Sequence, residues 1–230
     1  MSLLAASFEE RLNRFLVRVD RAGEATLCHL PNPGRLVELL PAGAPVLLER
    51  RQSPGRKTEY DLVAVRSREV WVSVDTRLPN RTVCSWLKEG LLPEFRGYSS
   101  IRPEVVVGAS RLDFLLRNGR DCYLEVKSCT LVEDGDALFP DAPTRRGTRH
   151  VETLAKLVGD GFRACVLFVI QRPDARRFRP QDETDPAFGK ALREAQAEGV
   201  EVFAYRTTFD RTTLVDPQRI QTDLRPRQLG

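Results

Sequence analysis

Short runs of alternating hydrophobic and polar residues fill the first third of the chain. Phe15, Val17 and Val19 alternate with Arg18 and Asp20, which is the period of two that a half-buried strand requires. The same reasoning predicts five strands, at residues 15–19, 25–30, 45–49, 60–66 and 70–76, with a helical turn at 35–40. Five short strands in about 65 residues predict a small barrel of the oligonucleotide-binding (OB) type.

The pattern changes after Pro79 to mixed helix and strand. We expect a helix from Asn80 to Gly90, three strands at 100–107, 111–117 and 122–127, a helix at 147–158, a buried strand at 163–171, a helix at 186–198 and a strand at 200–205. Helices between strands are typical of an α/β domain. The sequence therefore predicts two domains, an OB-like nucleic-acid-binding barrel at 1–79 and an α/β domain at 80–230.

Composition excludes several classes of protein. Hydrophobic residues make up 41% of the chain and charged residues 30%, which is globular composition. Residues 164–170 form the longest apolar run, far below the roughly 20 residues that span a bilayer, and the N-terminus lacks the basic start of a secretory leader. We expect a cytoplasmic protein without a membrane partner.

Cysteine and histidine are too few and too scattered to bind a metal together. The 5 cysteines are widely spaced without a C-x-x-C pair, and the 2 histidines are His29 and His150. Free, mostly buried thiols are expected, and any metal must be held by oxygen ligands.

One acidic pattern could carry chemistry. Asp113 lies in one predicted strand, and Glu125 and Lys127 lie in the next, where they project from the same face. Two carboxylates can bind a hard cation such as Mg²⁺ or Mn²⁺, and Lys127 could orient a water or stabilise phosphate charge. The alternative is an ordinary ion pair on an exposed strand.

The register of this hairpin decides whether the two carboxylates meet. A two-residue turn at Asn118-Gly119 would pair residues whose numbers sum to about 237, and would place Asp113 and Glu125 on opposite faces. A loop of odd length brings the sum to about 238 and sets Asp113 opposite Glu125. We therefore expect an odd loop or a bulge.

The acid followed by E-x-K, in this order of elements, resembles the PD-(D/E)xK nuclease-like fold, although Leu112 stands where that motif often has proline. Most of the chain also resembles the sugar fermentation stimulation protein family (SfsA-like), through HLPNPGRL at 29–36, TRLPNR at 76–81, RLDFLL at 111–116, YLEVKSCTL at 123–131, ALFPDAPTRRGTRH at 137–150 and LFVIQRPDARRF at 167–178. This resemblance implies an OB-like barrel joined to a nuclease-like domain that binds DNA. It also implies that Asp113, Glu125 and Lys127 form the nuclease-like site, with Glu89 of the first helix as a weaker additional metal ligand.

Basic clusters supply candidate phosphate contacts. They comprise Arg50, Arg51, Arg56 and Lys57 in the barrel, Arg145, Arg146 and Arg149 at the start of a helix, and Arg172, Arg176 and Arg177 after the buried strand. Helix starts attract phosphate, whereas a solvated arginine-rich surface is the alternative, especially for the last cluster. We expect His29 and His150 to be surface residues. Few aromatic residues lie among the clusters, so binding should be mainly electrostatic.

Together these features predict a DNA-binding protein with a Mg²⁺-dependent phosphodiester-hydrolysing site that contains Asp113, Glu125 and Lys127. The alternative is a non-catalytic DNA-binding regulator of sugar-metabolism genes. The acids favour hydrolysis, because two carboxylates that face a polyanion are unfavourable unless a cation neutralises them. A sugar-binding protein is a third class, but the chain shows no pocket motif for it.

Overall fold

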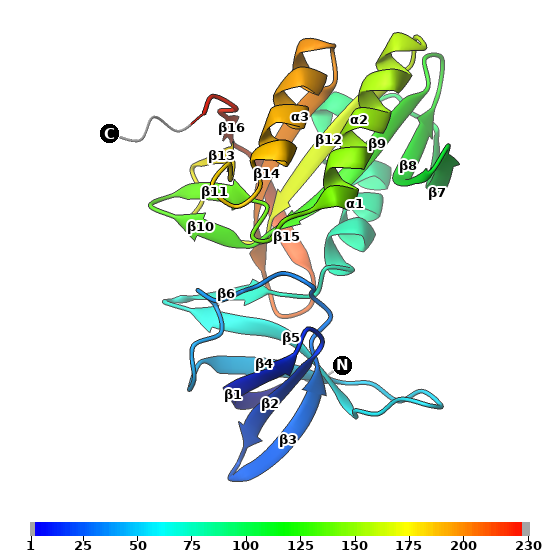
Figure 1. Cartoon of the computed structure of the whole chain (residues 1–230). Helices are drawn as coiled ribbons and strands as arrows, with labels where there is room; N and C mark the ends of the chain where they lie inside the picture. Colours follow the sequence, from blue (N-terminus) through cyan, green and yellow to red (C-terminus); the bar gives the residue numbers. More distant parts are fainter. Residues whose placement is uncertain (1–2, 227–230) are drawn as a thin grey trace.

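A computed structural model describes residues 3–226 of the chain. It contains a β-barrel below and an α/β domain above, as Figure 1 is drawn. The barrel holds the strands β1 (Leu4–Asn13), β2 (Leu16–Arg21), β3 (Glu24–His29), β4 (Pro45–Arg50), β5 (Tyr60–Ser67) and β6 (Val70–Ser73).

The barrel has OB topology. Its strands follow the order β3-β2-β1-β4-β5-β6, and a parallel pairing of β3 with β5 closes β1–β5 into a barrel. Fully buried side chains such as Val17, Val19 and Leu62 fill its interior. The predicted OB-like barrel is therefore confirmed, and β6 extends β5 outside the ring.

The predicted number of five barrel strands is correct, but one of the five predicted strands is not part of the closed barrel. β1 lies at residues 4–13, where no strand was predicted, and β6 was counted in its place. Two register shifts, between Phe8 and Glu10 and between Arg11 and Asn13, interrupt the alternation of β1. A bulge hides the period of two. The predicted helical turn at 35–40 is only a short turn, with Leu36 at a φ of 53°.

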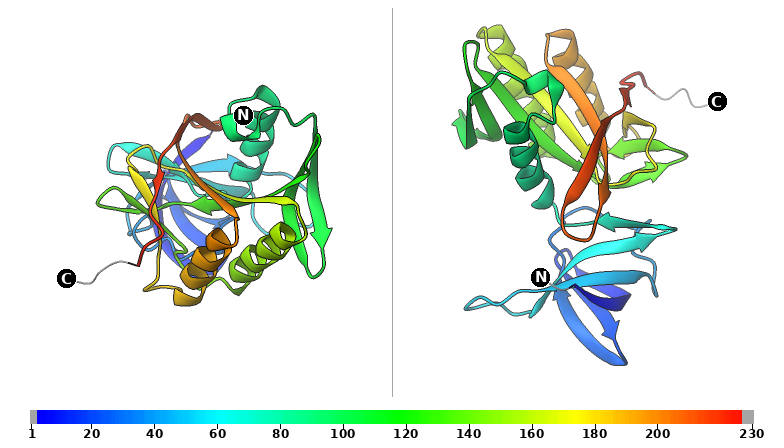
Figure 2. Two further views of the ribbon diagram at one scale, coloured as in Figure 1. Left: turned by 90° about the horizontal axis from the view of Figure 1, so that it is seen from above. Right: turned by 180° about the vertical axis from the view of Figure 1, so that it is seen from behind.

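The second domain is a six-stranded mixed sheet between helices. Its strand order is β15-β14-β12-β9-β8-β7, with β9, β12 and β14 parallel. Figure 2 shows α1 on one face of the sheet and α2 and α3 on the other. The elements are α1 (Leu78–Glu89), β7 (Ser100–Val107), β8 (Ser110–Arg117), β9 (Cys122–Cys129), α2 (Arg145–Gly159), β12 (Arg163–Ile170), α3 (Pro186–Ala197), β14 (Glu201–Phe209) and β15 (Leu214–Arg219).

The sequence prediction omitted a small second sheet. It contains β10 (Leu131–Glu133), β11 (Asp136–Phe139), β13 (Arg177–Pro180) and β16 (Gln221–Thr222), in the order β10-β11-β13-β16. Residues 128–146 were expected to be one long loop because they are rich in Asp, Gly and Pro. Strands of two to four residues are too short to show a hydrophobic period.

The barrel and the α/β domain share a continuous hydrophobic core. Leu47 and Val63 of the barrel belong to the same buried cluster as Trp86 of α1 and Phe209 of β14. The view from behind in Figure 2 shows the β14–β15 hairpin reaching the barrel beside β6. The two domains are thus packed against each other through apolar contacts.

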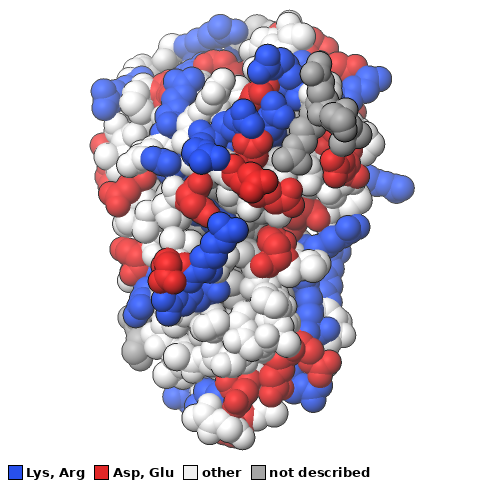
Figure 3. Space-filling view, turned by 90° about the vertical axis from the view of Figure 1, so that its left-hand side faces the viewer, with Lys and Arg blue, Asp and Glu red and all other residues white. Residues whose placement is uncertain are grey.

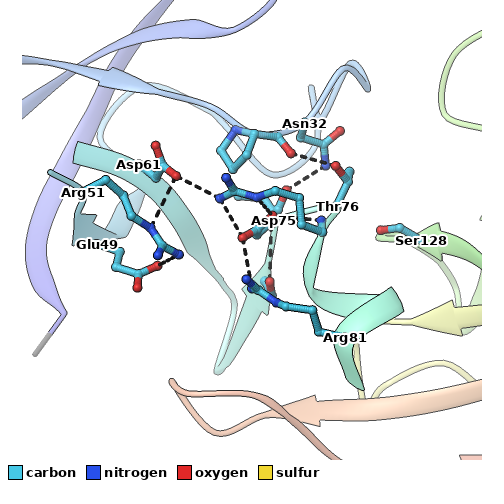
Figure 4. Close-up of polar contacts among 12 residues, drawn as sticks. Asn32, Glu49, Arg51, Asp61, Asp75, Thr76, Arg81 and Ser128 are labelled. Carbon is cyan, nitrogen blue, oxygen red and sulfur yellow. Dashed lines mark hydrogen bonds and ion pairs between the residues drawn. The ribbon is translucent and has the colours of Figure 1, made fainter. Parts of the chain in front are cut away.

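Ion pairs of two buried aspartates with partly exposed arginines reinforce this junction. Asp61 of β5 is fully buried, and its carboxylate lies 2.8 Å from Arg77 and 3.8 Å from Arg51. Asp75 is 3.6 Å from Arg81 of α1. Figure 4 shows Arg51 between Glu49 and Asp61, and Arg81 reaching Asp75. These bonds connect the barrel strands to the first turn of α1.

Two further expectations concern cysteines and membranes. All five cysteines are free, and four of them are buried, as predicted. No helix within residues 3–226 has the length and apolar character needed to cross a membrane.

Candidate metal centre and nucleic-acid surfaces

The register of the β8–β9 hairpin brings Asp113 and Glu125 together. The ladder pairs Phe114 with Leu124 and Leu116 with Cys122, so paired numbers sum to 238, as the odd-loop prediction requires. The loop centre, Gly119, has a φ of 78°, which glycine adopts readily. Asp113 directly precedes Phe114 in β8, and Glu125 directly follows Leu124 in β9. The same register, continued by one residue, sets Asp113 opposite Glu125. Asp113 Oδ2 accepts the backbone N–H of Val126 at 2.8 Å.

Glu125 is a buried carboxylate with one bonded oxygen and one orphaned oxygen. Its Oε1 accepts a hydrogen bond from Lys127 Nζ at 2.6 Å and another from His150 Nδ1. Its Oε2 is buried and has no hydrogen-bond partner within the described structure. Burial raises the pKa of Glu125, but Lys127 and His150 together outweigh it and lower the pKa overall. Glu125 is thus held as an anion with one oxygen left unpaired.

His150 is held in a single tautomer. Arg146 Nε donates to His150 Nε2 at 3.3 Å. A guanidinium can only donate, so Nε2 must accept and Nδ1 must carry the proton that is donated to Glu125. The hydrogen bond from Nδ1 fixes the orientation of the Glu125 carboxylate.

Asp113 is the second acid of the pair. Burial, and then the negative charge of Glu125, raise its pKa to about 7. Asn80 Nδ2 of α1 donates to Asp113 Oδ1 at 2.6 Å. This hydrogen bond and the one from the Val126 N–H lower the pKa of Asp113 and so offset part of the rise. The charge of Glu125 thus disfavours ionisation of Asp113, and a bound cation would relieve this repulsion.

The donor set suits a hard divalent cation. Across residues 3–226, no group of three or more His, Cys, Asp or Glu side chains could hold a metal ion, so a His- or Cys-rich zinc site is not found there. Two carboxylates are a donor set that fits Mg²⁺ or Mn²⁺, because Mg²⁺ takes one or two protein carboxylates and completes its coordination with water. The orphaned Glu125 Oε2 is the atom that such a cation would satisfy.

Sequence reasoning missed two residues of this site. His150 was expected on the surface, but only 2% of it is exposed. Its position repeats the buried stripe of Gly147, Val151 and Leu154 at helical spacing, and this signal could have found it. Asn80 was expected to cap a helix, but α1 begins at Leu78 with a proline in its first turn. Asn80 therefore lies inside the helix, with its amide free to reach Asp113.

Glu89 lies away from the acid pair. It is exposed at the C-terminal end of α1 and accepts a hydrogen bond from Ser85 at 2.6 Å. Nine residues separate it from Asn80, which is about 13 Å along a helix axis. Glu89 is therefore too far from the acid pair to be a ligand of the same cation.

The helix-start cluster adjoins the acid pair. Arg145, Arg146 and Arg149 are exposed on the first turns of α2, and Arg146 contacts His150 directly. Thr144 caps the helix by accepting the Gly147 N–H at 3.1 Å. These cations could contact phosphates at the site.

The other two clusters are largely paired with acids. In the barrel, Arg50 lies 2.5 Å from Glu59 and Arg51 lies 2.6 Å from Glu49, and Arg56 is bonded to Asp61. Lys57 is exposed and has no carboxylate partner among the described residues.

The third cluster is paired more completely. Arg172 is buried and bonded to Asp174, and Arg177 bonds Asp136 through two nitrogens. Arg176 donates to the Asp134 carbonyl at 2.6 Å. Figure 3 views the side that carries β10, β11 and β13, and basic and acidic side chains are interspersed there. This cluster is a weaker candidate for phosphate contacts than the helix start.

Comparisons with known proteins cover nearly the whole chain. The SfsA N-terminal OB domain matches residues 10–74, and the sugar fermentation stimulation protein RE domain matches residues 77–213. The chain belongs to the sugar fermentation stimulation protein family. Curated relatives, each a sugar fermentation stimulation protein homolog, include one from Caldanaerobacter subterraneus, 45% identical over 96% of this chain and 97% of its own. Another, from Moorella thermoacetica, is 48% identical over 93% of each.

A solved structure of this family has the same fold. The chain is similar to SfsA of Pyrococcus furiosus in complex with Ca²⁺, with a TM-score of 0.89 and 31% identity over 96% of both chains. The fold expected from sequence, an OB-like barrel joined to a nuclease-like α/β domain, is thereby confirmed.

Proposed function

We propose that this member of the sugar fermentation stimulation family hydrolyses DNA phosphodiester bonds with a divalent cation, Mg²⁺ or Mn²⁺. Asp113 and Glu125 would hold the cation, and Lys127 would act as the amine of the site. The observation that carries the proposal is the orphaned, buried Glu125 Oε2, next to a second carboxyl whose pKa is raised to about 7. An unpaired buried carboxylate oxygen is unfavourable unless a ligand satisfies it.

The residues of the chain have separable roles in this proposal. His150 and Lys127 hold Glu125 Oε1 and turn Oε2 toward the ligand position, while Asn80 orients Asp113. Lys127 also places a positive charge where negative charge develops on a reacting phosphate. A bound divalent cation would supply Lewis acidity and lower the pKa of a coordinated water.

DNA is the proposed substrate because of the cations around the acid pair. Arg145, Arg146 and Arg149 lie on the helix start beside the site, where side-chain charge and backbone N–H groups both attract phosphate. The solved relative from Pyrococcus furiosus contains Ca²⁺, which agrees with a site for divalent cations in the family. A cytoplasmic location remains the expectation from sequence.

A non-catalytic DNA-binding regulator is the second candidate. The same arginines favour it, since phosphate contacts alone position a protein on DNA. The acid pair separates the two functions, because two buried carboxylates weaken the binding of a polyanion unless a cation neutralises them.

Plasmid nicking tests the proposal. Wild type, Asp113→Asn and the control Glu89→Gln are incubated with supercoiled DNA in Mg²⁺, Mn²⁺ or EDTA. We expect metal-dependent nicking by wild type and Glu89→Gln, and a loss of roughly 100-fold or more in Asp113→Asn. DNA affinity of Asp113→Asn in EDTA should hold or rise, because a negative charge has been removed.

The opposite result identifies the regulator. The proposed hydrolysis would be overturned if wild type shows no metal-dependent nicking and if all three proteins bind DNA equally, with or without metal.

A further inference from the structure

We infer that a hollow between the barrel and the α/β domain binds a small monocarboxylate, with Arg211 as the residue that recognises the carboxylate group. This site is separate from the acid pair, and it does not require hydrolysis there. The hollow has a volume of about 180 Å³ and is lined by residues of β4, β5, β6, α1, β14 and the turn after β14. Small-molecule sites occur preferentially at such domain junctions.

One wall of the hollow is apolar. It consists of Leu3 and Val63 on the barrel side, Leu78 of α1 and Phe209 of β14. Val63, Leu78 and Phe209 belong to the buried cluster that joins the two domains, so this wall is part of the packed structure. A hydrocarbon chain that packs against the wall is removed from water, which favours binding. The volume equals that of about six waters, which limits the ligand to roughly six to eight non-hydrogen atoms.

Two arginines that line the hollow have unused hydrogen-bond donors. Arg211 has no carboxylate partner in the part of the chain that the structure describes, and its guanidinium lies over the Trp71 ring at 5.6 Å from the centroid. Arg81 approaches Asp75 only at 3.6 Å and makes no other ion pair within residues 3–226. A guanidinium presents a planar fork of donors that matches a carboxylate. The ring of Trp71 covers one face of Arg211, and the N–H groups at its edge remain free to donate.

The turn between β14 and β15 holds Arg211 in place before any ligand binds. The φ of Arg211 is 74°, in the left-handed region that few residues other than glycine adopt. Asp210 Oδ1 accepts the N–H groups of Thr212 at 2.7 Å and Thr213 at 2.8 Å. The Thr213 hydroxyl lies 3.3 Å from the Thr82 hydroxyl of α1. A fixed backbone lowers the entropy cost of binding, and unusual backbone conformations are concentrated at ligand sites.

The acids at the hollow are neutralised by other arginines. Asp75 accepts hydrogen bonds from Arg77 at both carboxylate oxygens, at 2.7 and 2.9 Å, and Glu49 lies 2.6 Å from Arg51. Figure 4 shows Glu49 beside Arg51, and Arg81 reaching toward Asp75. The positive charge that remains suits a ligand with one negative charge. A dianion such as phosphate fits less well, because two carboxylates lie at the same hollow.

Isothermal titration calorimetry with sodium butyrate tests the assignment. The full chain is titrated in metal-free buffer, because a bound cation would itself attract a carboxylate. The matched ligands are n-butanol, which keeps the carbon chain without a charge, and n-butylammonium, which carries the opposite charge. We expect butyrate to bind at a single site, and both matched ligands to bind roughly 10- to 100-fold more weakly, because they lack the charge-assisted hydrogen bonds.

Matched variants identify the residue. Arg211→Gln should weaken butyrate binding by roughly 10- to 100-fold, and Arg211→Lys, which keeps the charge without the fork, should give an intermediate loss. Arg68→Gln is the control, because Arg68 is another exposed arginine with a positive φ, of 53°, and does not line the hollow. It should bind butyrate like wild type. Thermal unfolding midpoints equal to wild type show that each variant is folded, and if Arg211→Gln unfolds, Arg211→Lys decides.

Four results would overturn the inference. They are no butyrate binding by wild type, butanol binding as tight as that of butyrate, inorganic phosphate binding tighter than that of butyrate, and equal butyrate affinity of wild type and the Arg211 variants. Butyrate binding that depends on Arg211, without metal-dependent nicking in the plasmid assay, would overturn only the proposed hydrolase. Nicking without butyrate binding would overturn only this inference.

Discussion

At the scale of single residues, the two acids of the site are held in different charge states. Lys127 and His150 keep Glu125 ionised, whereas burial and the Glu125 charge raise the pKa of Asp113 to about 7. A proton on Asp113 therefore competes with a cation near neutral pH. Metal binding should strengthen as pH rises through this range.

Asp113 should make the metal-free protein less stable as pH rises. Its pKa is higher in the folded chain than its ordinary value near 3.9. The folded state therefore retains a proton that the unfolded state loses between about pH 4 and pH 7. That stabilisation is complete below about pH 4 and is lost above about pH 7, with a total of up to about 4 kcal/mol.

Urea unfolding in EDTA at several pH values measures this effect. The free energy of unfolding of wild type should fall between about pH 4 and pH 7, and Asp113→Asn should remove that fall. Glu125 does not interfere, because its pKa is lowered and its contribution is lost only as pH falls below its ordinary value near 4.3. The same pH dependence in both proteins would show that Asp113 titrates normally.

At the scale of elements, α1 and the β8–β9 hairpin position the site together. The hairpin register places Asp113 opposite Glu125, and the first turn of α1 supplies the Asn80 amide to Asp113. Asp61 and Asp75 in turn hold arginines at the start of α1. The barrel therefore contributes to the orientation of the acid pair.

Asn80→Ala should shift the pH dependence of hydrolysis. The Asn80 hydrogen bond lowers the pKa of Asp113, so its loss should move the alkaline rise of metal-dependent nicking upward by roughly half to one pH unit. Ser85→Ala, an exposed change on the same helix, should leave the profile in place. A profile in Asn80→Ala that matches wild type would remove Asn80 from the site.

The elements also show how far sequence patterns reach. Alternation at residues 15–20 and 70–76 and the number of short strands predicted an OB-like barrel. The loop arithmetic allowed two registers, and the one that pairs Asp113 with Glu125 was predicted because a shared acid site requires it. These patterns could not reveal β1, because bulges break its period, or the short strands β10, β11, β13 and β16. Asn80 reaches the site only through the packing of α1 on the sheet, which no local pattern encodes. The burial of His150 could have been predicted, since His150 continues the buried stripe of α2.

At the scale of the whole molecule, charge is distributed unevenly between exposed and paired arginines. The helix-start cluster of Arg145, Arg146 and Arg149 is exposed beside the acids. Arg172 and Arg177 are bonded to aspartates. The net charge of +4 therefore understates the positive character of the proposed DNA path.

Duplex affinity should fall less steeply with salt than it would if all three basic clusters contacted DNA. If only the barrel loop and the helix start contact DNA, with about two phosphates each, the slope of log affinity against log salt should be about −3.6, rather than about −5 for three clusters. Arg149→Ala should reduce the magnitude of the slope by about 1, whereas Arg177→Ala should not change it. A binding isotherm series from low to high salt measures both, and a slope unaffected by Arg149→Ala would exclude the helix start.

The proposed hydrolase requires above all that the acid pair binds a cation. Anomalous scattering from crystals soaked in Mn²⁺ tests this directly, with Asp113→Asn crystals as the control. We predict one strong peak within about 2.0–2.3 Å of Glu125 Oε2 and an Asp113 carboxylate oxygen, and its loss in the variant. A peak elsewhere, or no peak at these two carboxylates at pH 8, would contradict the proposed metal centre.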